Sequence, residues 1–428
     1  MDILEQLYST DVWQEYLQYK REKHHISKSE EKALVSYIEE ARYLTQLDII
    51  CHGKDGANRY PDSANALPLP VKKEINKDGT TKKRVVYLFP ADFNQLLKGI
   101  TYLLYKYDDI FADNCYAFRR GIGVNDAVRR ICRMENIESK YCLKVDIRNY
   151  FNSIYVPMLL EKLDFLKEQD DRLFVFFQEL LMADAVLLEK NSTTKDSTKD
   201  GSEAERIVVS EQRGAMAGTP IAPFFANVYL RDVDYYFSDA GIPYFRYSDD
   251  ILLFAESEEE LTMLQTELYK LLEEHHLHIN PEKEHVSKPG EMFEFLGLCF
   301  SERKVDLSEH TKSKIKAKIR RKAKALRRWA LKKNLSTEKA AKGFIHAMNR
   351  KFYANEEDNV FSWSRWFFPN LTTAEGLKEI DTYMQEYIRY CVTGRHYKGN
   401  YRIHYELMKE WGYRNLVHEY YAGKMEDV

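Results

Sequence analysis

The 428-residue chain lacks paired cysteines, long apolar runs and a large net charge. Its six cysteines are scattered without a Cys-x-x-Cys pair, so they indicate neither a zinc site nor a disulfide framework and fit a reducing cytosol. No apolar run approaches the roughly 20 residues that cross a bilayer, and the acidic start at residues 1–5 is unlike a secretory signal. These absences favour a cytoplasmic protein without a membrane partner. The length of 428 residues is too great for one small core and predicts two or three subdomains.

The formal net charge of −3 conceals a strongly basic segment. Residues 312–333, here called the basic run, contain no acidic residue, while acidic segments elsewhere balance the sum. Ile315, Ile319 and Leu326 recur near helical spacing, so one side of a helix can pack while the other faces nucleic-acid phosphates. A solvated charged face is the alternative interpretation.

Two adjacent carboxylates, Asp249 and Asp250, stand in the middle of residues 244–255, between two runs rich in β-branched and aromatic residues. This pattern predicts a β-hairpin with the acids at its tip. Two like charges raise the free energy of such a site unless a cation neutralises them, and Mg²⁺ prefers carboxylate and phosphate oxygens. The alternative is an ordinary turn, in which Asp-Asp is common.

About a hundred residues upstream, Asp146 lies within an apolar strand formed by Leu143, Val145 and Ile147. Asp is disfavoured in strands, and an unpaired buried carboxylate is costly. Beside the hairpin it would complete a three-carboxylate cluster for two divalent ions, Mg²⁺ or alternatively Mn²⁺. Metals about 3.5–4 Å apart serve in-line nucleotidyl transfer from a nucleoside triphosphate to a 3′-hydroxyl.

The order of these segments resembles the motifs of reverse transcriptases, above all the bacterial branch that contains group II intron, retron and defence-associated enzymes. The resemblance covers about residues 70–300 and rests on several short segments in order. They are 115–128 (second fingers motif), 144–154 (motif A), 218–230 (motif B), 247–250 (motif C), 280–283 (motif D) and 295–297 (motif E).

The resemblance implies an α+β right-hand polymerase fold, with fingers, a palm built on an antiparallel sheet, a helical thumb, and helical N- and C-terminal extensions. The expected parts are an N-terminal extension at 1–60, fingers at 61–140, a palm at 141–300, a basic helical thumb at 301–360 and an aromatic-rich C-terminal extension at 361–428. Within the fingers we expect a hairpin at 71–90 and a helix at 91–107, and within the palm helices at about 156–190 and a polar loop at 191–206.

By motif position, Asp146, Asp249 and Asp250 are the expected metal ligands and catalytic carboxylates. Tyr247 is expected to position the primer end. Lys283 matches the lysine of motif D, a candidate general acid for the pyrophosphate leaving group. A phosphate contact or a surface lysine is the alternative role for Lys283.

Contacts to the incoming nucleotide are expected from the fingers hairpin and from motif A. Lys77, Lys83 and Arg84 are candidates to neutralise the triphosphate, Arg84 first because its fork matches phosphate oxygens; a solvated basic hairpin is the alternative. Phe151 stands at the position of the steric gate, where an aromatic ring excludes ribonucleotides and implies a DNA product. The alternative is that Tyr150 and Phe151 are both core residues.

Motif B departs from the family pattern. Gly214 and Gly218 allow close backbone approach, but Ala217 replaces the usual glutamine and Ala222 the following serine. Ala217 and Gly218 are still expected to border the nucleotide. Loss of the glutamine, which helps to place the templating base, makes unusual templating, short products or untemplated addition more plausible. Further primer and template contacts are expected at Gly297, Arg320 and Arg321.

The terminal segments resemble bacterial "unknown group" reverse transcriptases linked to phage defence. That resemblance implies a small non-coding RNA as template, dNTPs as substrates, a DNA product and, in some members, homo-oligomers or priming from a protein hydroxyl. Aromatic residues of the C-terminal extension could be core or could stack on bases. The rival interpretations are a maturase-like enzyme without its endonuclease, since no His/Cys cluster of the HNH type follows, and an RNA-binding protein without activity.

Overall fold

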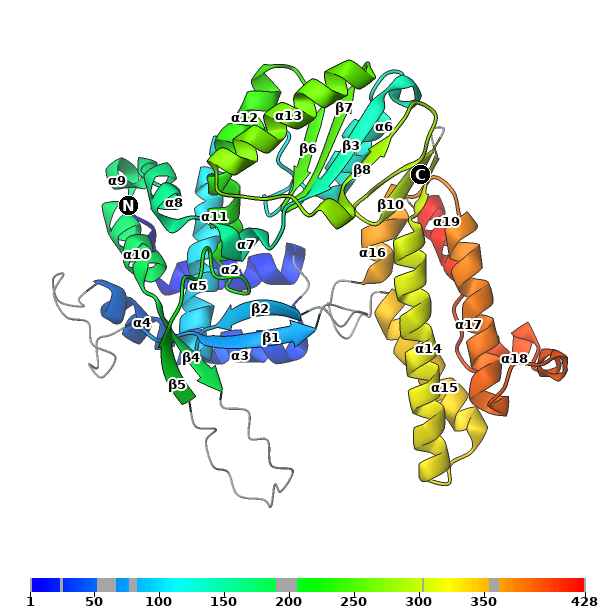
Figure 1. The fold of residues 1–428 in the computed structure, drawn as a ribbon. Coiled ribbons are helices and arrows are strands. Elements are labelled where there is room, and N and C mark those ends of the chain that lie inside the picture. The colour runs from blue at the N-terminus through cyan, green and yellow to red at the C-terminus, as the bar shows by residue number, and fades with distance from the viewer. Residues whose placement is uncertain are drawn as a thin grey trace. The chain divides into compact units, whose positions relative to one another are not determined.

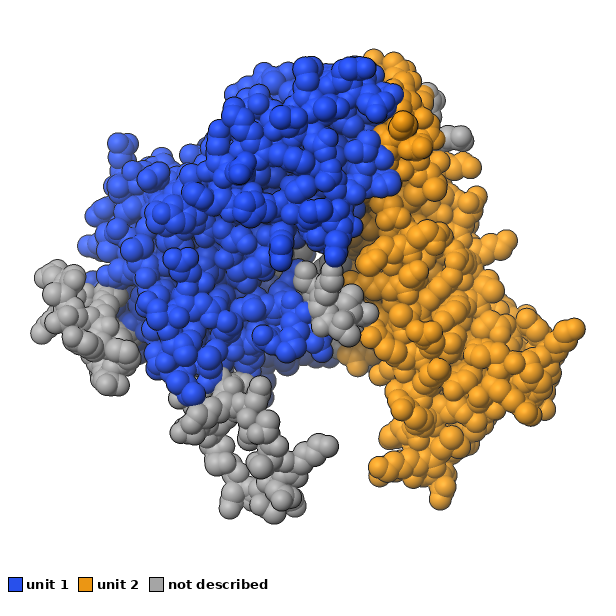
Figure 2. Space-filling view, in the orientation of Figure 1, with its two compact units in different colours: residues 1–23, 28–123, 141–286 blue, residues 24–27, 124–140, 287–428 orange. Residues whose placement is uncertain are grey.

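The structure is a computed structural model that describes residues 2–23, 26–51, 67–76, 83–189, 206–301, 304–353 and 362–426. The chain divides into two compact units. Unit 1 comprises residues 1–23, 28–123 and 141–286, and unit 2 comprises residues 24–27, 124–140 and 287–428 (Figure 2). Within the described ranges, no helix is both long and apolar enough to cross a membrane.

The N-terminal helices of unit 1 pack around a buried tryptophan. They are α1 (Ile3–Gln6), α2 (Thr10–Lys23), α3 (Lys28–Glu39) and α4 (Arg42–Cys51). The sequence predicted two or three helices over residues 1–50, and the additional one is the four-residue helix α1. The Trp13 ring lies so close to Gly99 of α5 (Ala91–Leu103) that a Cβ there would overlap it. Its indole Nε1 donates to the Leu7 carbonyl at 2.8 Å. This segment is therefore part of the core of unit 1.

A four-stranded sheet in the order β2-β1-β4-β5 follows (Figure 1). Its strands are β1 (Val71–Asn76), β2 (Lys83–Leu88), β4 (Ala185–Glu189) and β5 (Arg206–Ser210). The hairpin expected at 71–90 is confirmed as the antiparallel pair of β1 and β2, and β1 also pairs in parallel with β4. Lys77 and nearly all of the polar loop predicted at 191–206 lie outside the described residues.

The helical prediction over 156–190 is wrong at its C-terminal end. The helices there are α8 (Val156–Lys162), α9 (Phe165–Gln169) and α10 (Asp171–Met182), and the next apolar run forms β4. Hydrophobic periodicity does not separate a short buried strand from the end of a buried helix. Pairing of β4 with both β1 and β5 decides in favour of the strand.

The second sheet of unit 1 carries the carboxylates and has the order β6-β7-β3-β8. Its strands are β3 (Tyr141–Asp146), β6 (Tyr244–Tyr247), β7 (Asp250–Ala255) and β8 (His285–Ser287). The hairpin predicted at 244–255 is confirmed as the antiparallel pair of β6 and β7, and residues 251–255 of the inner strand β7 are all buried. Helix α13 (Glu258–Glu274) packs on β3 and β7 (Figure 1).

The largest segment of unit 2, residues 287–428, starts with a three-stranded sheet. Its strands are β9 (Phe293–Phe295), β10 (Leu298–Ser301) and β11 (Lys304–Leu307). With β8, three short strands (β8, β9 and β10) begin within residues 278–300, where the sequence predicted two, and β11 follows beyond that range. The predominantly helical character after residue 308 is confirmed by α14 (Glu309–Lys332), α15 (Thr337–Phe352) and α17 (Glu375–Thr393), which pack on one another.

The other elements are short. They are η1 (Leu104–Ile110), α6 (Val124–Cys132), η2 (Ile137–Ser139), α7 (Tyr150–Ser153), α11 (Ala222–Tyr229), α12 (Arg231–Asp239), η3 (Pro281–Lys283), α16 (Trp363–Phe367), η4 (Phe368–Asn370), η5 (Lys398–Arg402), α18 (Tyr405–Glu410) and α19 (Leu416–Glu426). The single helix expected at 222–238 is therefore broken into α11 and α12.

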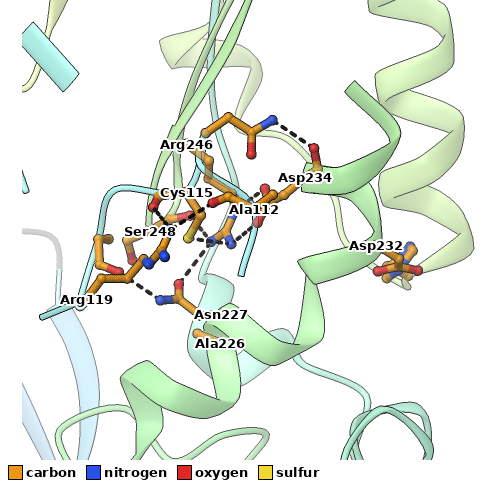
Figure 3. Close-up of polar contacts among 12 residues, drawn as sticks. Ala112, Cys115, Arg119, Ala226, Asn227, Asp232, Asp234, Arg246 and Ser248 are labelled. Carbon is orange, nitrogen blue, oxygen red and sulfur yellow. Dashed lines mark hydrogen bonds and ion pairs between the residues drawn. The ribbon is translucent and has the colours of Figure 1, made fainter. Parts of the chain in front are cut away.

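A fully buried ion pair between Arg246 and Asp234 connects strand β6 to helix α12 (Figure 3). The Arg246 guanidinium donates from Nε and Nη2 to the two carboxylate oxygens of Asp234 on α12, at 2.7 and 2.5 Å. It also donates to Asn227 Oδ1 on α11 at 3.3 Å and contacts Cys115 Sγ at 3.1 Å. The arginine thus joins one strand, two helices and the segment that holds Cys115.

We expect Asp234→Ala to lower the free energy of unfolding by about 3–5 kcal/mol, because Arg246 would stay buried without its counter-charge. Urea unfolding followed by circular dichroism measures the loss. Glu74→Ala is the control, since it removes only an exposed ion pair with Lys83 and should change the free energy of unfolding far less. Equal losses in the two variants would contradict the role given to the buried pair.

Candidate active site

Strand register brings the three predicted carboxylates to one end of the β3-β7 pair. Asp146 and Asp250 are directly opposite each other, and Asp249 lies in the turn that precedes β7. Ile147 N donates to the Asp249 carbonyl at 2.9 Å, which ties the turn to the end of β3. Side chains of directly opposed residues share one face of a sheet, with Cβ atoms about 4.5–5.5 Å apart.

The turn between β6 and β7 has a strained backbone conformation, and the buried Arg246 contacts it. Ser248 has a φ of 61°, a left-handed conformation that non-glycine residues adopt at a cost of about 1–3 kcal/mol. Its carbonyl lies 3.5 Å from Nη1 of Arg246, within the buried network of Figure 3. Arg246 is a residue that the sequence reasoning missed. The available signal was a lone charge between apolar and aromatic strand residues, the same signal that identified Asp146.

Burial and the charges of neighbouring carboxylates make Asp249 and Asp250 hard to ionise. The pKa of Asp249 is raised, first by burial and then by the charge of Asp146. Burial raises the pKa of Asp250 to about 6; the cation Lys144 opposes this shift, while Asp249 and Asp146 add to it. The site therefore carries negative charge that is not fully balanced, as expected of carboxylates that share a site.

The donor chemistry fits Mg²⁺ or Mn²⁺, because all three side chains offer hard carboxylate oxygens. Among the described residues, however, no three His, Cys, Asp or Glu side chains are grouped closely enough to enclose a metal ion. One oxygen of Asp146 is instead ion-paired with the Lys283 ammonium. Holding two ions would thus require Asp146 to exchange this partner and the carboxylates to draw together.

Lys283 reaches Asp146 because its backbone is tied to the same strand. Asn280 N donates to the Asp146 carbonyl at 2.8 Å, and Lys283 N donates to the Asn280 carbonyl at 2.9 Å. The Lys283 side chain is 50% exposed, so its amino group is accessible as well as paired. This position beside the carboxylates suits either role predicted for it, proton donor or phosphate contact.

The two neighbouring aromatic residues of motif A have different environments. Tyr150 is buried, and its hydroxyl donates to the Ala226 carbonyl at 2.5 Å, so the core interpretation holds for Tyr150. Phe151 is only partly buried and packs edge-on against the exposed ring of Phe118, with centroids 6.2 Å apart. Phe118 in turn lies 6.4 Å from the ring of Tyr247. The gate candidate and the primer-positioning candidate therefore border one aromatic cluster.

Asn152, which the sequence reasoning missed, links motif A to motif B and to the hairpin. Its side-chain amide donates to the Val85 carbonyl of β2 at 3.2 Å, and its Oδ1 accepts from Ala217 N at 3.1 Å. The Ala217 carbonyl accepts from Tyr87 N at 2.8 Å. Motif B thus holds its place through the backbone of Ala217. No feature of the sequence separates Asn152 from an ordinary polar residue; only these contacts do.

The two glycines expected to permit close approach do so. A Cβ on Gly214 would lie 2.5 Å from the Phe151 carbonyl oxygen, and one on Gly218 would lie 2.9 Å from Val86 Cβ. Both have positive φ, 54° and 98°, which L side chains rarely adopt. The loop can therefore lie against motif A and against β2 at the same time.

The hairpin cations differ in their partners. Lys83 is paired with Glu74 across the hairpin, with Nζ and Oε2 2.5 Å apart. Arg84 is exposed, and its charge acts to lower the pKa of Asp249. Arg84 is thus electrostatically coupled to Asp249, and binding of the triphosphate by Arg84 stays a prediction.

The remaining predicted contacts lie in unit 2. The Gly297 carbonyl accepts from Thr311 Oγ1 at 2.8 Å and from Ser308 N at 3.0 Å, and so anchors the first turn of α14. Arg320 and Arg321 are exposed on α14. Primer and template binding by these three residues stays a prediction.

Comparison with known proteins identifies the family. Residues 74–300 match the reverse transcriptase (RNA-dependent DNA polymerase) family. Over 106 residues the chain is 31% identical to the Retron Ec86 reverse transcriptase of Escherichia coli, a match that covers 24% of this chain and 33% of that enzyme. The match thus spans about a third of the relative's length.

Solved telomerase structures are also similar. Apo telomerase from Candida tropicalis matches with a TM-score of 0.46 at 10% identity, covering 87% of this chain and 63% of that chain. Telomerase from Candida albicans, solved with a fragment of telomeric RNA, matches with a TM-score of 0.40 at 14% identity, covering 89% and 71%. Because the segment matched by the family is more than half of the 428 residues, the chain belongs to the reverse transcriptase family and has its α+β polymerase fold.

Proposed function

We propose that this chain is an RNA-directed DNA polymerase that adds dNTPs to a primer 3′-hydroxyl by metal-dependent nucleotidyl transfer. The observation that carries the proposal is the placement of Asp146 opposite Asp250, with Asp249 in the adjoining turn, in a member of the reverse transcriptase family. Asp146 and Asp249 would contact the metals most directly, with Asp250 beside them. Two bound Mg²⁺ ions supply Lewis-acid stabilisation of the attacking and leaving oxygens.

The protein's own groups supply charge and a proton. Arg84, exposed and coupled to Asp249, neutralises the triphosphate of the bound nucleotide. Lys283 parts from Asp146, and its ammonium gives a proton to the pyrophosphate oxygen as the bond to the α-phosphorus breaks. Both cations thus oppose the negative charge that develops on the leaving group.

Phe151 excludes ribonucleotides from the site, so the product is DNA. Its ring is partly exposed, beside an exposed Phe118, and the next residue, Asn152, fixes both motif B and strand β2. A ring held at this position occupies the space that a ribose 2′-hydroxyl needs. Deoxynucleotides are therefore the substrates.

The template is a small non-coding RNA, and the setting is bacterial defence against phages. The likeness to a retron enzyme over 106 residues supports this branch of the family. Helical segments on both sides of residues 74–300 offer surface for an RNA of defined structure. Ala217 holds motif B by its backbone and lacks a side-chain amide for the templating base, which supports short or unusually templated products.

Asp249→Asn should reduce dNTP incorporation on a primed RNA template with Mg²⁺ at least about a thousandfold, because a metal ligand is lost. Labelled-primer extension measures this, with the exposed Asp239→Asn as the matched control. Retention of more than a tenth of the activity would remove Asp249 from the metal site. No incorporation by the wild-type chain with its own RNA would favour the RNA-binding protein without activity.

Phe151→Ala should raise the use of ribonucleotides relative to deoxynucleotides by about ten- to a hundredfold in kcat/KM, because the clash with the 2′-hydroxyl is relieved. Single-nucleotide extension with each nucleotide measures the ratio. Tyr236→Ala, which removes an exposed ring elsewhere in unit 1, serves as the control. An unchanged ratio in the Phe151 variant would show that this residue is not the gate.

Asp250→Asn should stabilise the metal-free protein at pH 7.5 by about 1–3 kcal/mol, since the wild-type chain must then bury a charged carboxylate whose pKa is raised to about 6. The raised pKa favours the protonated form in the folded state, so the wild-type loses stability as pH rises through about 6. The advantage of Asn should therefore shrink at about pH 5. Urea unfolding in EDTA at both pH values tests this, and a pH-independent difference would contradict it.

A further inference from the structure

The C-terminal extension contains a segment rich in basic and aromatic residues and free of acids. Residues 394–405 hold no Asp or Glu. Around the short helix η5, five side chains of exposed residues form what we call the C-terminal patch: Arg395, Tyr397, Lys398, Tyr401 and Arg402. All of them belong to unit 2 and lie beyond the segment matched by the reverse transcriptase family.

Exposure separates Tyr397 and Tyr401 from the core tyrosines of the extension, and their acid-free surroundings separate them from Tyr421, which is 52% exposed but follows Glu419 closely in the sequence. Tyr387, Tyr413 and Tyr420 are at most 7% exposed and belong to the core. Tyr397 and Tyr401 are 42% and 59% exposed. Exposed aromatic rings in a basic setting offer stacking surface for bases, so the structure selects two candidates from a tyrosine-rich sequence.

Tyr401 presents one face to a buried cation and leaves much of its ring open. The Arg389 guanidinium lies 4.9 Å from the ring centroid and is itself only 8% exposed. Arg389 Nε donates to the Ile403 carbonyl at 3.3 Å, which holds the guanidinium in place. The cation fixes the orientation of the ring, so stacking on its free surface costs little side-chain entropy.

Tyr397 is held in a comparable way. The Arg395 guanidinium lies 4.8 Å from its ring centroid. The ring also lies against Gly399, where a Cβ would overlap Tyr397 Cε2. Glycine at 399 therefore permits this ring position.

The backbone under the patch is organised by a buried asparagine. Asn400 is 1% exposed, and its side-chain amide donates to the Arg395 carbonyl at 2.7 Å. Its backbone N donates to the Tyr397 carbonyl at 3.0 Å, and its carbonyl accepts from Ile403 N at 3.0 Å. The rings and cations thus project from a preformed loop.

The positive charges of the patch have no acidic partner among the described residues. A neighbouring acid, Glu386, is engaged with Arg389 at 3.4 Å and lies 3.9 Å from His396. Across the described ranges, no carboxylate is ion-paired with Arg395, Lys398 or Arg402. Three unpaired cations beside two exposed rings are complementary to a polyanion that carries flat, unpaired bases.

We propose that the C-terminal patch is an accessory binding surface for single-stranded RNA. Tyr397 and Tyr401 stack on unpaired bases, and Arg395, Lys398 and Arg402 contact the flanking phosphates. A duplex would offer phosphates but no open base faces, so the two exposed rings favour a single strand. The choice of RNA over DNA rests on the proposed function, whereas single-strand binding does not.

The test uses full-length protein carrying Asp249→Asn, a fluorescent unstructured RNA of about 20 nucleotides, and anisotropy titrations between about 50 and 200 mM salt. Tyr397→Ala combined with Tyr401→Ala should weaken binding roughly 10- to 100-fold, from the loss of two stacking contacts. Replacing Arg395, Lys398 and Arg402 by Gln should reduce the slope of log K against log salt by about 2. Tyr235→Ala combined with Tyr421→Ala, which also removes two exposed rings, should change little.

Tyr401→Phe, which keeps the ring, should bind the RNA with the affinity of the parent protein. This result would show that the affinity lost in the alanine variant comes from the missing ring and not from a folding defect. Unchanged RNA affinity in the double alanine variant would overturn the proposal. Equal weakening for a DNA strand of the same length would overturn the assignment to RNA. Failure of the Asp249-intact chain to incorporate dNTPs would overturn the proposed function alone, because the binding measurement does not depend on catalysis.

Discussion

The candidate site depends on the buried pair of Arg246 and Asp234. Two adjacent acids at a hairpin tip repel each other, and the left-handed turn residue Ser248 adds backbone strain. Arg246 supports the strained turn, because its guanidinium contacts the Ser248 carbonyl while Asp234 balances its charge and Asn227 also accepts from it (Figure 3). A rigid support beneath a strained, charged turn is what a preorganised metal site needs.

A second constraint acts through the backbone of motif B. Asn152 and Tyr87 bind the amide and the carbonyl of Ala217, so the loop keeps its place without the family's usual glutamine. The glycines at 214 and 218 allow the close approach on both sides. We propose that catalysis and template reading are thereby separated in this chain, since the three carboxylates of the proposed metal site are present whereas the glutamine side chain expected to help place the templating base is absent.

Much of the site could be predicted because its acidic residues stand where strand propensity and the cost of burying charge disfavour them. Asp146 and the Asp249-Asp250 pair interrupt apolar strands, where unpaired charge is costly. The strand β4 was not predictable, since its apolar run continues from helix α10 and only pairing with β1 and β5 distinguishes it. Nor could the sequence single out Asn152, whose importance comes from partners 65 and 67 residues away along the chain.

We propose that the three carboxylates hold the metal ions of nucleotidyl transfer. The most direct measurement counts the Mn²⁺ ions bound per chain by electron paramagnetic resonance, in the presence of a primer on an RNA template and a non-hydrolysable dNTP analogue. We expect two tightly bound ions, both lost in a variant carrying Asp146→Asn and Asp249→Asn. Equal Mn²⁺ binding by the wild-type chain and this variant would show that these carboxylates do not hold the metal ions.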